Sequence, residues 1–410
     1  MANDSSPLII TLEQKSKKKM AFVIALVMLA AIVASYTGML MHDPPTRALF
    51  FGLAVLCAAF MLSWAAELAQ IDIPKGLAIA LLALIAVMPE YAIDGYFAWT
   101  AGTDPSYIAY ATANMTGANR LLIGVGWALL VLIFWLKTRK HTLEFEHSNR
   151  VEIGFLLTAS LYSLIIPLKG TLSLMDTAIL FLLFVMYMVR VSKTHMEEPH
   201  LVGPPKLVAS FAQNKRRMMT ILFFLLAAFI ILVSTEPFAE SLLETGEHAG
   251  IDEFLLIQWL APLASEAPEF IIAFIFAFRL LPKIGFETLL SSKINQWTLL
   301  VGALPLIYAV SLLTAGSLSG AQFAGSAMIL DHRQVQELLL TAAQSLFAVS
   351  ILLNLRITFK GAIVLFGLFV IQFLHPELHY PLSFVYLFLA MLFFIRDRKH
   401  LKPAFRSLIK

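Results

Sequence analysis

The feature that most constrains this chain is a series of apolar runs, each roughly 20 residues long, separated by short polar segments. A helix of that length crosses the hydrocarbon core of a bilayer. Hydrophobic residues make up 59% of the 410 residues and charged residues only 14%, so a soluble fold could not bury the apolar surface. We therefore predict an all-α integral membrane protein whose main solvent is lipid.

Hydropathy along the chain separates twelve apolar spans. Six lie in the first half, at about 20–41, 48–70, 75–100, 107–136, 151–168 and 171–192. Six lie in the second half, at about 218–236, 253–281, 286–315, 335–355, 359–375 and 380–396. The polar segment 193–217 separates the two sets, and we interpret it as a cytoplasmic connector rather than a folded domain.

Several basic segments occur where an even number of spans has been crossed, among them KSKKK before the first span, LKTRK after the fourth and RDRKHLK after the last. The segments HDPPTR, AGTDPS and ESLLETGEHAGIDE are neutral or acidic, and we expect them to be loops on the opposite side. The positive-inside rule then places both termini in the cytoplasm. We expect a multi-pass protein of the plasma membrane, which would be the inner membrane of a prokaryote.

Two spans contain a proline followed directly by a glutamate, Pro89-Glu90 in AVMPEYAIDGYFAW and Pro268-Glu269 in LAPLASEAPEF. Proline removes one backbone hydrogen bond that lipid cannot replace, so each proline should mark an interrupted helix facing an internal site. A carboxylate at that depth needs a proton, a basic group or a cation. Carboxylates and freed carbonyls are hard oxygen ligands that suit Na⁺ or Ca²⁺. The alternative is a simple kink, with each glutamate paired to a basic side chain.

The surroundings of the two Pro-Glu pairs are also similar. The helix that follows each pair contains small and polar residues, ATANMTGANRLLIGVGW in the first half and TLLSSKINQWTLLVGAL in the second. Under the predicted topology the first Pro-Glu helix runs outward and the second runs inward, so the two halves form an inverted repeat. Many secondary transporters are built from inverted repeats with broken helices near the midplane.

At these residues the sequence resembles the sodium/calcium exchanger membrane family of the cation/Ca²⁺ antiporter superfamily, which carries G-T-S-x-P-E and G-N-x-x-G-S-N-like motifs. The resemblance implies two inverted five-helix repeats, at 48–192 and 218–375, joined by the connector 193–217. Residues 1–47 and 376–410 would each add one membrane helix, which makes about twelve in total.

The resemblance also implies a set of site residues. Glu90 and Glu269 match the two ion-binding glutamates of the family and are the expected metal ligands. The other motif positions that could bind the cation are Asn114, Asn119, Ser265, Glu266, Ser291 and Ser292. Three departures stand out: Glu266 replaces a serine, Lys293 replaces the last asparagine, and Arg120 directly follows Asn119. The first repeat also has Ile85, Ala86 and Val87 in place of G-T-S.

The charged residues near these motifs have more than one interpretation. Asp94 shares a helix face with Glu90, and it either extends the ion site or pairs with Arg120. Glu266 and Glu269 also share a face, and two close carboxylates in a low dielectric rarely both stay ionised without a cation. That pair offers a route to proton coupling.

The basic residues are equally open. Lys293 either extends to the headgroups or points inward, where its ammonium would act as a built-in counter-ion that a cation displaces. For Arg120 we expect an ion pair with Asp94 or with Glu67, and for Glu67 a structural place near a cytoplasmic helix end. The histidines, including His42, His141, His147, His195, His375 and His379, fall at helix ends or in loops, where we expect them to be interfacial rather than metal ligands.

The sequence therefore predicts a secondary antiporter, not an enzyme, that exchanges Ca²⁺ for Na⁺ or H⁺ by alternating access. One alternative is a monovalent Na⁺/H⁺ antiporter. Another is a non-transporting membrane scaffold in which Arg120 and Lys293 fill the cation sites. We expect inorganic cations and lipid as partners, no resident cofactor and no nucleic acid, and the sequence leaves the oligomeric state open.

Overall fold

The computed structural model describes residues 7–72, 87–192, 201–320 and 322–408. Ten helices in the described part of the chain are long and apolar enough to cross a membrane, and Phe359–Leu374 forms a shorter apolar helix. The protein is thus an all-α, multi-pass membrane protein, as predicted. The predicted span at 75–100 lies partly outside the described residues, so the total of twelve stays a prediction.

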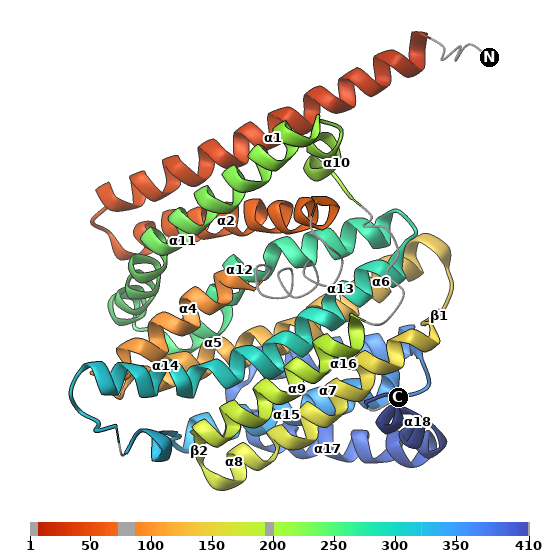
Figure 1. Ribbon diagram of the computed structural model, residues 1–410. Coiled ribbons are helices and arrows are strands. Elements are labelled where there is room, and N and C mark those ends of the chain that lie inside the picture. The colour runs from red at the N-terminus through yellow and green to blue at the C-terminus, as the bar shows by residue number, and fades with distance from the viewer. Residues whose placement is uncertain (1–6, 73–86, 193–200, 321, 409–410) are drawn as a thin grey trace. The chain divides into compact units, whose positions relative to one another are not determined.

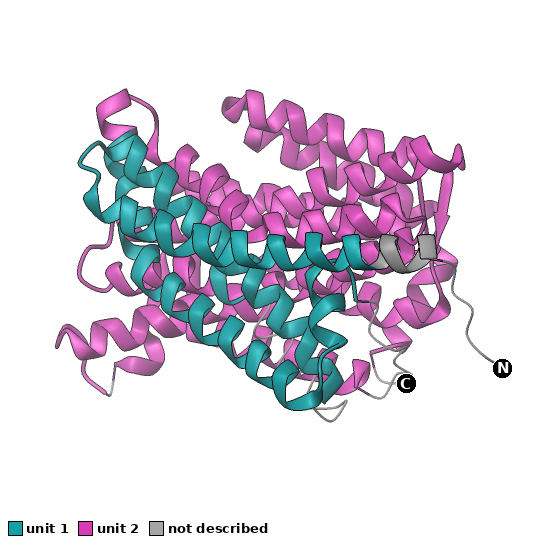
Figure 2. Ribbon diagram, turned by 90° about the horizontal axis from the view of Figure 1, so that it is seen from above, with its two compact units in different colours: residues 1–89, 196–245 teal, residues 90–195, 246–410 magenta. Residues whose placement is uncertain are grey.

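The chain forms two compact units, residues 1–89 with 196–245 and residues 90–195 with 246–410 (Figure 2). The helices of the first unit are α1 (Pro7–Leu40), α2 (Pro44–Asp72), α10 (Pro204–Ala209) and most of α11 (Gln213–Ala249). The short helix α10 lies within the predicted connector 193–217.

Side-chain bonds join the long helices of the first unit. The hydroxyls of Ser35 on α1 and Ser234 on α11 lie 3.1 Å apart. Arg216 on α11 donates two bonds of 2.8 Å to the carboxylate of Asp72, where α2 ends. Helix α11 continues through Pro237 to Ala249, so most of the segment ESLLETGEHAGIDE is helical and the prediction of a loop there was wrong. A single proline removes only one hydrogen bond, and the neighbouring turns carry the helix past it.

The second unit contains two series of elements (Figure 1). The first series is α4 (Met88–Thr100), α5 (Tyr107–Leu121), the π-helix η1 (Leu122–Trp127), α6 (Ala128–Thr138), β1 (Thr142–Glu144), the 3₁₀ turn η2 (His147–Asn149), α7 (Arg150–Ser163), α8 (Ile165–Lys169), β2 (Thr171–Ser173) and α9 (Leu174–Val191).

The second series has the same order of long helices, π-helix and strands, but its 3₁₀ turn precedes the first strand and, within the described residues, it has no counterpart of α8. It is α12 (Glu253–Phe278), α13 (Pro282–Asn295), the π-helix η3 (Gln296–Leu300), α14 (Val301–Thr314), the 3₁₀ turn η4 (Phe323–Gly325), β3 (Ala327–Ile329), α15 (His332–Leu352), β4 (Arg356–Thr358) and α16 (Phe359–Leu374). The chain ends with η5 (Pro376–Leu378), α17 (His379–Arg396), η6 (Arg398–His400) and α18 (Leu401–Arg406).

The short strands connect the two series. Strand β1 pairs antiparallel with β4, with Leu143 opposite Ile357, and β2 pairs antiparallel with β3, with Leu172 opposite Met328. Each strand of one series therefore pairs with a strand of the other. The two series are interleaved within one unit and do not form separate lobes.

Four helices, α4, α5, α12 and α13, carry the residues of the candidate site. Helix α12 packs against both α5 and α13, and α5 also packs against α15. The close approach of α5 and α12 depends on Gly117, because a Cβ atom at this position would lie 1.8 Å from the backbone oxygen of Gln258. Proline at position 262 leaves that carbonyl without its usual helical partner. A small residue on one helix and a proline on the other thus fit the two backbones together.

Candidate cation-binding site

The two glutamates of the Pro-Glu pairs lie in the same buried region of the second unit. Glu90 is in the first turn of α4 and is 1% exposed, whereas Glu269 is within α12 and is 9% exposed. Their carboxylates interact electrostatically with each other, and Glu266 interacts with both of them. Asp94, one turn after Glu90, also interacts with Glu90. We call these four residues the acidic cluster.

The two prolines have different local structures. Pro89 lies at the start of α4, and the stretch 73–86 before it lies outside the residues that the structure describes. Pro268 lies inside α12, which continues without a break from Glu253 to Phe278 and also contains Pro262. The prediction that Pro268 interrupts its helix was therefore wrong. Proline removes a hydrogen bond at this point, but the rest of the ladder holds the helix together.

The acidic cluster contains more hydrogen-bond acceptors than donors. Among the described side chains, both carboxylate oxygens of Glu90 and one oxygen each of Asp94, Glu266 and Glu269 are buried with no hydrogen-bond partner. A buried carboxylate without donors is costly unless a proton or a cation compensates it. The simple-kink alternative, in which basic side chains saturate Glu90 and Glu269, therefore has no support from the hydrogen bonds of the described residues.

No group of three or more His, Cys, Asp or Glu side chains within the described ranges is close enough to hold a metal ion. Carboxylates alone thus do not form a complete coordination shell in this conformation. Amide, hydroxyl or carbonyl oxygens would have to complete a site for a hard cation.

Asp94 pairs with an amide and not with Arg120. The side-chain nitrogen of Asn114 donates to Asp94 Oδ1 at 2.8 Å, and both residues are fully buried. The amide oxygen of Asn114 has no hydrogen-bond partner. The prediction of an Asp94–Arg120 pair was wrong because Arg120 points toward a different set of helices, while Asn114 lies on the face of α5 that reaches α4.

Lys293 points into the protein. Its side chain is fully buried, and its ammonium donates to Asn119 Oδ1 at 2.6 Å and to the backbone oxygen of Asn119 at 3.3 Å. The ammonium also lies 4.4 Å from the ring centre of Trp297 and interacts electrostatically with Glu266. The snorkelling interpretation was therefore wrong, because α13 turns this residue toward α5 and away from the headgroups.

The serines of the predicted set are arranged differently from one another. Ser265 is buried, and its hydroxyl donates to the backbone oxygens of Ala261 and Pro262, each at 3.3 Å. The Ser292 hydroxyl lies beside the carboxylate of Glu269. Ser291 is only partly buried and exchanges a 3.1 Å hydrogen bond with the hydroxyl of Tyr187 on α9. Ser292 therefore has better access to the acidic cluster than Ser291.

A π-helical segment follows the polar motif in both series. The segment η1 begins three residues after Asn119, and η3 begins three residues after Lys293. In the second series, Gln296 is the first residue of the π-helical segment η3, and its side-chain nitrogen donates to Glu266 Oε1 at 2.9 Å. Single π-helical turns inside α-helices occur frequently at functional sites. Sequence reasoning missed Gln296, although an amide within a long apolar span was a detectable signal.

Arg120 belongs to a second buried group, which sequence reasoning also missed. Its Nη2 atom lies 2.6 Å from Glu337 Oε2 on α15, and its guanidinium stacks 5.0 Å from the ring centre of Trp259. His379 Nδ1 lies 2.7 Å from the other oxygen of Glu337. The predictions that Arg120 pairs with Asp94 or Glu67 and that His379 is interfacial were wrong. Glu337 could not be recognised as the partner because it follows Arg120 by more than 200 residues.

Glu67 lies in the first unit, on α2, five residues before the helix ends at Asp72. It is largely buried, and its carboxylate accepts a hydrogen bond from the backbone of Val202. This contact agrees with a structural place for Glu67 within that unit.

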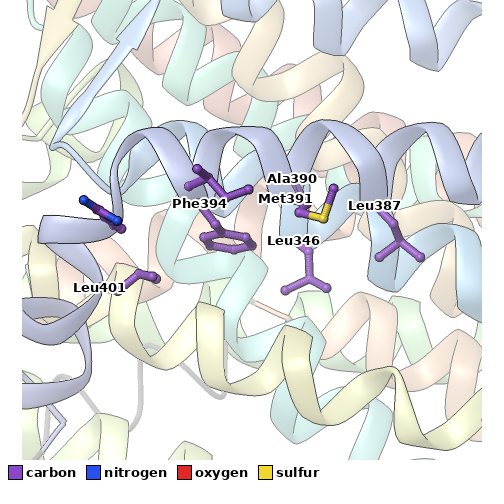
Figure 3. Close-up of a pocket in the computed structure, with 8 residues that line it drawn as sticks. Leu346, Leu387, Ala390, Met391, Phe394 and Leu401 are labelled. Atoms are coloured by element: carbon purple, nitrogen blue, oxygen red, sulfur yellow. The ribbon is translucent and has the colours of Figure 1, made fainter.

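One pocket of the second unit is unsuitable for a cation. It has a volume of about 400 Å³ and lies along α17 (Figure 3). Its lining is apolar, with Leu346, Leu387, Met391 and Phe394 among its residues, and Arg398 is the charged side chain beside it. A cation would find neither a carboxylate nor an amide oxygen there, so we place the candidate site at the acidic cluster.

Comparison with known families decides what kind of protein carries this cluster. The model of the sodium/calcium exchanger protein family matches residues 44–193 and 219–375, which cover most of the chain. The chain belongs to this family. The match includes both Pro-Glu helices and confirms the resemblance seen in the sequence. A comparison with curated proteins found no match.

Solved structures of exchangers share the fold. The crystal structure of an H⁺/Ca²⁺ exchanger, CAX, is 43% identical in sequence and superposes with a TM-score of 0.89 over 96% of this chain and 98% of that one. The Ca²⁺/H⁺ antiporter protein YfkE is 15% identical, with a TM-score of 0.64 over 86% of this chain and 98% of that one. The sodium-calcium exchanger NCX_Mj is also 15% identical, with a TM-score of 0.53 over 81% and 98%.

Proposed function

We propose that this exchanger-family protein is a secondary antiporter that moves Ca²⁺ in exchange for H⁺. The observation that carries the proposal is the acidic cluster, where five buried carboxylate oxygens of Glu90, Asp94, Glu266 and Glu269 have no hydrogen-bond partner among the described residues. The 43% identity with an H⁺/Ca²⁺ exchanger supports the choice of ions. The relatives at 15% identity support the fold alone.

The charges of the site favour competition between Ca²⁺ and protons. If the four carboxylates of the acidic cluster and the Lys293 ammonium were all ionised, three negative charges would remain in excess in a low-dielectric interior. Such an excess is strongly unfavourable. Either one Ca²⁺ ion or two protons would remove two of these charges. Because both bind the same oxygens, occupancy by one excludes the other, and this exclusion couples their movements.

Each predicted ligand has a place in this proposal. Glu90 and Glu269 would bind the ion directly, and the Asn114 amide oxygen, which has no hydrogen-bond partner, is available as a neutral ligand. Ser292, beside Glu269, and Ser265 would supply hydroxyl oxygens. Glu266, held by Gln296, lies between the ion and Lys293 in this scheme.

Lys293 would act as a tethered cation. Its ammonium donates a hydrogen bond to the side-chain oxygen of Asn119. Asn119 matches an asparagine of the family motif in the first repeat. Ca²⁺ could use Asn119 only if the ammonium moved away, so cation entry and displacement of Lys293 would be linked.

We further infer that the two series of the second unit form inverted repeats across the membrane. Their similar order of helices, π-helix and strands and the reciprocal pairing of β1 with β4 and β2 with β3 support this layout. Basic segments at both ends of the chain support cytoplasmic termini in a plasma membrane. Alternating access would then arise from outer helices that slide past a core formed by the Pro-Glu helices and their partners.

The second candidate is a monovalent Na⁺/H⁺ antiporter, which the Lys293 ammonium favours because it lowers the charge available for a divalent ion. The scaffold alternative requires both Arg120 and Lys293 to fill cation sites. Arg120 instead forms an ion pair with Glu337, so it does not fill a cation site.

The test is ion flux into proteoliposomes with a pH gradient or a Na⁺ gradient imposed. We expect Ca²⁺ uptake under the pH gradient, loss of uptake in Glu269→Gln, and normal uptake in the matched control Glu247→Gln, whose side chain is exposed. Uptake driven only by Na⁺ would refute proton coupling. Na⁺ flux without Ca²⁺ flux would establish the monovalent alternative. Equal fluxes of any cation in the wild type and Glu269→Gln would refute the site.

A further inference from the structure

A second buried ionic group lies in the same unit as the acidic cluster but uses different residues. It consists of Arg120 on α5, Glu337 on α15 and His379 at the start of α17, and we call it the buried triad. The side chains of these residues are 0–3% exposed. Helix α17 lies beyond the region that the family model matches, which ends at residue 375.

Glu337 is surrounded by donors. Its Oε2 atom accepts a hydrogen bond from Gln258 Nε2 at 2.9 Å and forms an ion pair with Arg120 Nη2 at 2.6 Å, and its Oε1 atom lies 2.7 Å from His379 Nδ1. Hydrogen bonds from charged donors favour the ionised form of a carboxyl group. Glu337 therefore acts as a carboxylate that accepts hydrogen bonds and has no proton to donate.

The ring of His379 has an acceptor at both nitrogens. Nδ1 faces the Glu337 carboxylate, and Nε2 lies 2.7 Å from the backbone oxygen of Gln372 on α16. A neutral imidazole carries one N–H group, whereas the imidazolium carries two. Because neither acceptor can donate, both bonds exist together only when His379 is doubly protonated. The geometry thus requires one proton more than a neutral histidine would hold.

The proton on His379 sets the net charge of the buried triad. The charged and titratable groups around His379 in the described part of the chain are Glu337 on α15, Arg120 on α5, Tyr386 on α17 and Glu377 in the turn before α17. With the proton bound, the buried triad carries two positive charges and one negative charge. Release of the proton would make the triad neutral but would place a ring lone pair against an acceptor oxygen.

Loss of the proton has a structural consequence. One of the two bonds of His379 must break, and this removes a polar contact of α17 with either α15 or α16. Helix α5 is affected as well, because Arg120 depends on the same carboxylate and directly follows Asn119, which holds Lys293.

We propose that the buried triad is a second proton-binding site, separate from the acidic cluster, in which the proton on His379 fastens the last membrane helix to α15 and α16. This inference concerns proton binding and helix packing and stands whether or not the protein carries Ca²⁺.

The test is the pH dependence of thermal unfolding of the purified full-length protein in Ca²⁺-free detergent solution. Because both ring contacts of His379 require the doubly protonated ring, the proposal predicts that the stability of the folded protein falls as pH rises. We expect a lower melting temperature at pH 8 than at pH 6 in the wild type, and at least half of this difference lost in His379→Gln. The matched control His375→Gln, an exposed residue paired with Glu377, should keep the full difference.

A second measurement covers the case in which His379→Gln does not fold. Nitrogen-15 spectra of the wild-type protein labelled at histidine should contain one slowly exchanging ring with both nitrogens protonated at pH 6. An unchanged pH difference in folded His379→Gln, or a buried ring with a single proton at pH 6, would overturn the proposal. Neither readout involves ion flux, so failure of the proposed transport activity would leave both results interpretable.

Discussion

The acidic cluster and the buried triad are both buried and both charged, but their hydrogen bonding differs. In the buried triad, each Glu337 oxygen has a donor and both ring nitrogens of His379 have acceptors. In the acidic cluster, five carboxylate oxygens have no partner within the described residues. Ion pairs and hydrogen bonds between charged groups on different helices hold those helices together. A network with unpaired acceptors is suited to the reversible binding of a proton or a cation.

The largest expected effect is the loss of ion flux when the acidic cluster is changed. Glu90→Gln and Glu269→Gln should reduce Ca²⁺ flux to the level of empty liposomes, a larger effect than the roughly 10–100-fold cost of changing groups around a metal ligand. Because each substitution removes an uncompensated buried charge, the melting temperature should stay the same or rise. Flux and melting are measured on the same preparations, with Glu247→Gln as control. A variant that loses flux only because it unfolds would contradict the comparison.

Changing the buried triad should have the opposite result. Glu337→Gln leaves the Arg120 guanidinium buried without its counter-charge, and breaking a buried ion pair in this way costs about 3–5 kcal/mol. We expect a clear fall in melting temperature, measured by tryptophan fluorescence. The control Glu377→Gln removes an exposed carboxylate paired with His375 and should cause a much smaller change. Equal melting of Glu337→Gln and the wild type would remove the structural role of the triad.

The third effect concerns the contact that holds α5 against α12. Gly117→Ala introduces a Cβ atom 1.8 Å from the Gln258 backbone oxygen, so the two helices must separate. Overpacking of this kind costs roughly 1–3 kcal/mol, and it should also lower Ca²⁺ flux because α5 carries Asn114 and Asn119. Gly367→Ala on α16 is the matched control, because no atom lies within 4 Å of its added Cβ. The melting temperature and the Ca²⁺ flux are measured for both alanine variants. Equal values for Gly117→Ala and Gly367→Ala would show that the contact between α5 and α12 does not depend on Gly117.

A smaller effect is expected from the tethered ammonium. Lys293→Gln keeps a donor for Asn119 but removes a positive charge next to Glu266. Cation affinity should rise, and a lost repulsion of about 1.4 kcal/mol would lower the KM for Ca²⁺ about tenfold. The measurement is the Ca²⁺ dependence of flux, with Lys402→Gln in the exposed tail as control. An unchanged or higher KM would mean that Lys293 does not oppose cation binding.

The smallest effect separates the two adjacent serines. Ser291 is bonded to Tyr187, so Ser291→Ala should change the KM for Ca²⁺ less than about twofold, whereas Ser292→Ala removes a hydroxyl beside Glu269. Loss of one oxygen ligand or hydrogen bond of about 0.5–1.5 kcal/mol corresponds to a change of several fold. Flux assays of the two variants at the same Ca²⁺ concentrations provide the comparison. A larger change in KM from Ser291→Ala than from Ser292→Ala would place the cation beside Ser291 instead of Ser292.

The sequence by itself determined the membrane character, the apolar spans and the family, because these depend on composition, span length and two local Pro-Glu motifs. It also identified Glu90, Glu266 and Glu269, since a carboxylate in an apolar span is unusual whatever surrounds it. Ten long apolar helices within the described residues and the match to the exchanger family confirm the coarse part of this interpretation.

Only the tertiary structure decided which partners the charged residues take. Arg120 pairs with Glu337, Lys293 with Asn119, and His379 with Glu337, and none of these pairs is local in the chain. The direction in which a helix faces its neighbours determines such contacts, and helical periodicity alone cannot supply it. The sequence therefore determined which residues are chemically unusual, whereas helix packing decided which of them are satisfied and which remain available to an ion.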